Sequence, residues 1–149
     1  MASLPVISPG NKYMGGTVFT IRMDCINDLF YEAGSNDPEE EILKVQSVLN
    51  ANNSRLQTLY ANAHSRSSFK TMAGSKVGAH ALIAADEIFS CCTNLYGDGT
   101  GAAGKDTNMS AASFAGAVVR LANLRWLMQH GMAGSSDLAL HTQSFLQEQ

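Results

Sequence analysis

A proline followed by three consecutive glutamates gives this sequence its strongest structural constraint. Asp37 stands immediately before Pro38, and Glu39, Glu40 and Glu41 follow. An aspartate can cap a helix, proline suits the first helical position, and the helix dipole favours acids in the first turn. Glu40 also stands three residues after Asp37, close to the spacing of a capping box. We therefore predict that a helix begins at Pro38.

The apolar residues after this start recur every three or four positions, and only Asn52 interrupts the pattern. This spacing is typical of a helix with one buried face. We expect a single helix over residues 38–63, about 26 residues and roughly 40 Å long. Its buried face would carry Ile42, Val45, Leu49, Leu56, Leu59 and Ala63.

Capping and stop residues predict four further helices. A short helix is expected over 25–33, and two long ones over 76–96 and 111–130. A last short helix should follow a cap at Ser136. Between them, the polar segment 65–75 is expected to contain a turn and the glycine-rich segment 97–108 to form a loop.

The first 22 residues are predicted to be extended, because their prolines and glycines exclude a helix. Residues 17–21 alternate and are partly β-branched, which is typical of a short strand. This segment either lies across a neighbouring subunit or folds back on its own helices. In the first case, deleting residues 1–22 should cost assembly and leave the helices folded.

Taken together, the patterns predict an all-α fold, a helical bundle of three long and two short helices with an extended N-terminal arm. The arm covers residues 1–22, and one bundle domain covers residues 23–149. The chain has no run of apolar residues long enough for a transmembrane helix and no features of a signal peptide. Its three cysteines, an odd number, favour a reducing compartment. We expect a cytoplasmic or virion location, without membrane contact.

The motifs that usually carry chemistry are incomplete. Residues 99–106 resemble a phosphate-binding loop, but Asp106 replaces the required serine or threonine. No histidine or cysteine pair has a zinc-ligand spacing. Cys91 and Cys92 are adjacent, so they diverge on a helix and one of them is expected in the core. We expect no cofactor, no metal and no enzymatic activity; an enzyme using Cys91 or Cys92 is a weaker alternative.

Charge is sorted along the chain. It contains 13 acids and 10 bases, yet residues 42–85 contain no acid and five bases. Lys44, Arg55 and Arg66 are spaced by eleven residues, about three helical turns, so a continuous helix would place them in one row. Residues 107–136 are also free of acids and add Arg120 and Arg125.

This acid-free stretch, with Tyr60 and Phe69 available for stacking, suits single-stranded nucleic acid read without much sequence preference. The candidate contacts are Arg55, Arg66, Lys70 and Lys76, followed by Arg120 and Arg125. The same bases can instead meet an acidic patch on a neighbouring copy. The isoelectric point of about 5.7 is low for a monomeric nucleic-acid binder, which favours many copies acting together.

Charged residues make up only 15% of the chain, against about 25% in typical domains, which favours self-association. The sequence therefore predicts a self-assembling structural protein, such as a viral coat or nucleocapsid subunit. It would pack single-stranded RNA or DNA, or a neighbouring subunit, through its basic stretch, with the arm on a neighbour. The alternative is a small helical adaptor with an acidic protein partner.

Overall fold

The computed structural model describes residues 19–22, 26, 29, 37–95, 108–130 and 137–147. Within these ranges the chain is almost entirely helical, and the β-pairing is limited to one bridge between Ser65 and Asn108. The all-α prediction is confirmed at this level. The helices are α2 (Pro38–Ala51), α3 (Asn53–Ala63), α4 (Arg66–Lys76), the 3₁₀ helix η1 (Ala79–Ala81), α5 (Leu82–Leu95), α6 (Ala111–His130) and α7 (Leu138–Gln147).

The helix predicted to begin at Pro38 does so. The Asp37 side chain accepts a hydrogen bond from the Glu40 backbone N–H at 3.1 Å. The expected continuous helix over 38–63 was wrong, because α2 ends and α3 begins on either side of Asn52. Asn52 is buried, and its Nδ2 donates to the Val48 carbonyl at 2.8 Å and to Gln143 Oε1 of α7 at 2.9 Å. An asparagine amide that bonds backbone in this way competes with regular helix.

The segment 65–75, expected to contain a turn, lies instead almost wholly in helix α4. Ser65 and Ser68 form a capping box, with Ser65 Oγ accepting from the Ser68 N–H at 3.2 Å and Ser68 Oγ accepting from the Ser65 N–H at 3.0 Å. The helix buries Phe69 and Ala73, which are one turn apart. The capping box and the two buried apolar residues thus favour a helix in a segment of polar composition.

The α-helix predicted over 76–96 begins only at Leu82, because the helical conformation is interrupted at Gly78. Gly78 has φ of 140° and ψ of 160°, a region that residues with a Cβ rarely adopt. A Cβ at this position would also lie 2.4 Å from the His80 ring. Gly78 thus separates α4 from η1 and α5.

Gly78→Ala is expected to lower the free energy of unfolding by about 1–3 kcal/mol through backbone strain. Urea denaturation followed by circular dichroism measures the change. Gly74→Ala is the matched control, since Gly74 lies inside α4 and a Cβ there would only approach the Leu82 side chain at 3.3 Å. Equal stability of the Gly78 variant and the wild type would contradict the strained geometry.

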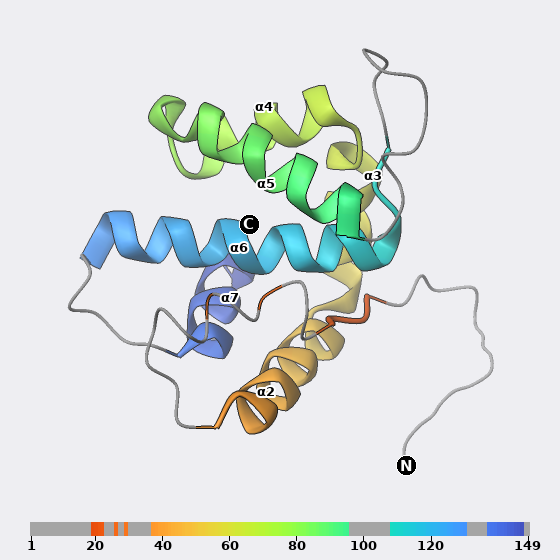
Figure 1. Ribbon diagram of the computed structural model, residues 1–149, viewed down its shortest axis with the longest axis vertical. Coiled ribbons are helices and arrows are strands. Elements are labelled where there is room, and N and C mark those ends of the chain that lie inside the picture. Colours follow the sequence, from red (N-terminus) through yellow and green to blue (C-terminus); the bar gives the residue numbers. More distant parts are fainter. Residues whose placement is uncertain are drawn as a thin grey trace.

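Helix α6 is the central element, with α4 and α5 above it and α2 and α7 below it in Figure 1. It occupies the range expected from the sequence. Its first half is buried on every side, and its small residues let the neighbouring helices approach closely. The buried set comprises Ser113, Phe114, Ala115, Gly116, Ala117, Val118, Val119, Leu121 and Ala122.

The described end of the predicted arm, residues 19–22, packs on the helices of its own chain. Phe19 and Ile21 are buried in the common core. The Gln46 side chain holds both of their backbones: the Ile21 N–H donates to Oε1, and Nε2 donates to the Phe19 carbonyl, each at 2.9 Å. The sequence left two placements open for the arm, and residues 19–22 adopt the second: they fold back on the helices of their own chain.

Some predictions fall outside the described residues. These are the arm before residue 19, most of the helix expected over 25–33 and most of the loop expected over 97–108. Of the short helix, Ile26 and Leu29 are described; both are helical and buried. In the described part of the chain, no helix has the length and apolar character needed to cross a membrane.

Candidate nucleic-acid interface

The row expected from Lys44, Arg55 and Arg66 does not form. These three residues lie on α2, α3 and α4 respectively, because the chain interrupts its helix at Asn52 and again before Arg66. A spacing of eleven residues places side chains on one face only while a single helix continues. The prediction of one basic row was therefore wrong.

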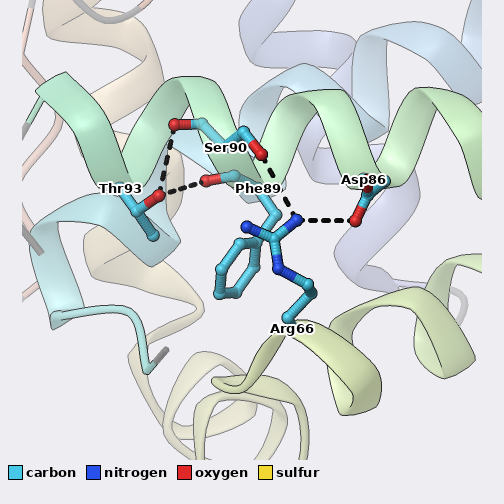
Figure 2. Close-up of polar contacts among 5 residues, drawn as sticks. All are labelled: Arg66, Asp86, Phe89, Ser90 and Thr93. Atoms are coloured by element: carbon cyan, nitrogen blue, oxygen red, sulfur yellow. Dashed lines mark hydrogen bonds and ion pairs between the residues drawn. The ribbon is translucent and has the colours of Figure 1, made fainter. Parts of the chain in front are cut away.

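The Arg66 side chain extends from α4 toward helix α5 (Figure 2). Its Nη1 lies 2.6 Å from Asp86 Oδ1 and 3.3 Å from Ser90 Oγ, and its guanidinium sits 4.8 Å from the centre of the Phe89 ring. The interaction ties the start of α4 to α5. Because Asp86 already neutralises Arg66, this residue is a poor contact for a phosphate.

Lys44 also finds acids within its own chain. Its Nζ lies 3.7 Å from a carboxylate oxygen of Glu40 and 3.7 Å from one of Glu41, both on the same helix. Two of the five bases of the acid-free stretch are thus paired with acids that lie just outside it in sequence. Lys44 and Arg66 therefore find negative partners within their own subunit.

Two of the three remaining bases of that stretch, Lys70 and Lys76, lie on helix α4. This helix contains Arg66, Lys70 and Lys76 and no acid. Its exposed side carries three hydroxyl residues at intervals of four, Ser67, Thr71 and Ser75. Residues spaced by four lie above one another on a helix, so the hydroxyls form a line beside Lys70.

The charge of Arg125 on α6 acts on Lys76 of α4. Partial burial, and then the nearby Arg125 charge, lower the pKa of Lys76 below its usual value. Two cations that interact in this way create a local positive potential that attracts an anion. We name the combined set the α4 surface: Ser67, Lys70, Thr71, Ser75, Lys76 and Arg125.

Arg55 and Arg120 lie apart from the α4 surface. Arg55 is exposed on α3, and its Nη1 lies 3.4 Å from Asn52 Oδ1. Arg120 lines a pocket between α5 and α6. It precedes Arg125 by five residues, so the two side chains leave α6 about 140° apart. Of the six residues predicted to bind nucleic acid, Lys70 and Lys76 share α4, about 120° apart around its axis, and Arg125 acts electrostatically on Lys76.

The two aromatic residues expected to stack on bases pack instead in or against the hydrophobic core. Phe69 is fully buried, with its ring 6.2 Å from that of Phe89. Tyr60 donates its hydroxyl to the Met109 carbonyl at 2.7 Å and packs edge-on against Phe19 and Phe114. Phe69 therefore offers no free face to a base, and the prediction was wrong for this residue; Tyr60 is partly buried.

The line of hydroxyls is not among the predictions made from the sequence. Ser67 and Thr71 accompany the bases in the sequence, but Ser75 gains its place only once residues 66–76 are helical. The serines at positions 65 and 68, three residues apart, were the signal for that helix.

The described residues show no group of three or more histidine, cysteine or acidic side chains arranged to hold a metal ion. Cys92 is buried, which agrees with the expectation that one of the adjacent cysteines lies in the core, and Cys91 is exposed. The segment that resembles a phosphate-binding loop lies outside the described residues.

The chain matches no protein-family model, no curated protein and no solved structure. Its function therefore has to be argued from its own residues.

Proposed function

We propose that this chain is a self-assembling structural protein, a coat or nucleocapsid subunit, that packs single-stranded nucleic acid against its α4 surface. The observation that carries the proposal is helix α4 itself, which has no acid and combines Lys70 and Lys76 with a line of exposed hydroxyls; its third base, Arg66, is paired with Asp86. Lysines supply charge to phosphate groups, and a hydroxyl such as that of Ser75 can donate a hydrogen bond to them, without reading the base. The Thr71 hydroxyl already donates to the Ser67 carbonyl at 3.0 Å.

Self-assembly compensates for the small number of charges. One subunit offers Lys70, Lys76 and Arg125, which is too few for tight binding at physiological salt. Copies aligned along one strand add their contacts, because each further contact is made at high effective concentration. The low charged content of the chain, 15%, reduces repulsion between copies.

Exposed apolar side chains further support assembly. Leu43 and Ile83 are 68% and 78% exposed in the single chain. Burying such residues between copies is favourable, since apolar area is removed from water. In this proposal the helices form a bundle that acts as a rigid building block.

The triple variant Lys70→Gln, Lys76→Gln and Arg125→Gln is expected to lose most nucleic-acid binding. Binding of labelled single-stranded oligonucleotides, deoxythymidine or uridine homopolymers, is measured by fluorescence anisotropy from low to high salt. Each phosphate contact contributes about 0.7 to the slope of log affinity against log salt. Three lost contacts should therefore reduce the slope by about 2 and weaken binding at low salt by roughly tenfold or more.

Arg55→Gln is the matched control, since Arg55 is exposed on a different helix, α3, and belongs to neither the α4 surface nor the exposed apolar residues. Its affinity and salt slope should equal those of the wild type. Circular dichroism establishes that each variant keeps its helices. An unchanged slope in the triple variant would refute the α4 surface as the contact.

A further inference from the structure

An open pocket of about 310 Å³ lies between α5 and α6. Apolar side chains from both helices and from Leu29 form most of its wall, with Ala84 and Ile88 on α5 and Leu124 and Leu127 on α6. It also carries one acid, Glu87, and one base, Arg120, together with Cys91 and Asn123. Such a site between two helices suits an apolar anchor from another helix flanked by one charge of each sign.

Helix α2 presents a face of this kind. Leu43 is 68% exposed, the most exposed of the large apolar residues on this helix. Glu39 lies one turn before it and is exposed, and Lys44 follows it with a side chain that is 52% exposed. The contact of Lys44 with Glu40 is solvent-exposed, and an ion pair of this type contributes little to stability, so Lys44 can exchange it for another acid; the Glu41 side chain is only 18% exposed.

We propose that Leu43 of one copy enters the α5–α6 pocket of a second copy, with Lys44 facing Glu87 and Glu39 facing Arg120. This inference rests on the proposed self-assembly and identifies its contact. The signs match in both pairs, and the apolar anchor lies between them. A helix that anchors an exposed leucine in an apolar pocket is a common mode of recognition between proteins.

The two surfaces belong to separate parts of the molecule. Helix α2 lies at the lower end of Figure 1 and α5 in its upper part. Each copy carries Leu43 on α2 and the pocket between α5 and α6, so the contact joins two different surfaces and is heterologous. Such a contact repeats from copy to copy and builds a ring or a filament. None of the α4-surface residues lines the pocket, so that surface is left for nucleic acid.

A charge swap tests the proposed pairing in nucleic-acid-free protein by sedimentation velocity at several concentrations. Lys44→Glu alone and Glu87→Lys alone are each expected to weaken self-association by about tenfold or more, because each places like charges together. The double variant carrying both changes should regain wild-type association. Rescue of this kind would not follow from misfolding of either single variant.

Leu43→Ser should also weaken self-association and give monomers. Leu140→Ser is the control: Leu140 is 45% exposed on α7, and its variant should assemble normally. Cys91 provides a second readout, since it is exposed in the single chain and lines the pocket. Its alkylation, followed by peptide mass spectrometry, should be slow in assembled wild type and fast in the Leu43 variant.

The outcomes separate this docking contact from the proposed function. If the wild type assembles and the Lys44→Glu, Glu87→Lys or Leu43→Ser variant assembles equally well, the docking contact is overturned and self-assembly still stands. The same follows if the double charge variant fails to regain association. A wild type that remains monomeric at every concentration overturns both.

Discussion

Phe19→Ala is expected to lower the free energy of unfolding by about 3–5 kcal/mol, the usual cost of truncating a buried phenylalanine. Phe19 is 2% exposed, and its ring centre lies 5.8 Å from that of Tyr60 and 6.2 Å from that of Phe114. Truncation leaves a cavity among these rings and loosens the segment that Gln46 holds against α2. Since whole domains are stable by only about 5–15 kcal/mol, the loss is a large fraction of the total.

Urea denaturation measures this effect, and Thr20→Ala is the neighbouring control. Thr20 is exposed, so its variant should stay within about 0.5 kcal/mol of the wild type. Deleting residues 1–22 removes Phe19 and Ile21 together and should destabilise the domain at least as much. If both the deletion and Phe19→Ala left stability unchanged, residues 19–22 would not belong to the core.

Phe69→Ala is expected to have a similarly large cost, about 3–5 kcal/mol. Phe69 is fully buried on α4 and faces Phe89 of α5. Together with the Arg66–Asp86 ion pair, this contact fixes α4 on α5. Losing it should therefore release the α4 surface as well as destabilise the domain. Thr71→Ala, an exposed position on the same helix, should change stability by less than about 0.5 kcal/mol.

A milder substitution of Phe69 distinguishes two roles of its side chain, packing in the core and stacking on a nucleic-acid base. Phe69→Leu retains an apolar side chain, so the fold survives with a smaller loss of stability. Because Phe69 is buried, the affinity of this variant for single-stranded oligonucleotides should equal that of the wild type. A selective loss of affinity with unchanged stability would show that the ring contacts a base.

Local signals in the sequence predicted much of the helical structure. Asp37 and Pro38 marked the start of α2, and the apolar stripe through Val45, Leu49 and Leu56 identified a face that is buried. The break at Asn52 was harder to predict, because its amide bonds Gln143, which is far away in sequence. Helix propensity alone cannot reveal such a distant partner.

The candidate site depended even more on contacts between distant segments. Arg66 and Asp86 lie on separate helices, so the sequence could not show that this base is already paired. The effect of the Arg125 charge on Lys76 likewise follows from the packing of α4, α5 and α6. Charge patterning drew attention to one stretch of chain, but only the fold divides its bases between internal pairs and an exposed surface.

Light scattering coupled to size-exclusion chromatography tests the central claim, that the chain is an assembling subunit, most directly. The purified wild type is run at increasing concentration, with and without a single-stranded oligonucleotide. We expect particles much heavier than the 15.9 kDa chain, which grow with concentration and retain the oligonucleotide. A single species of 15.9 kDa under all of these conditions would contradict the account.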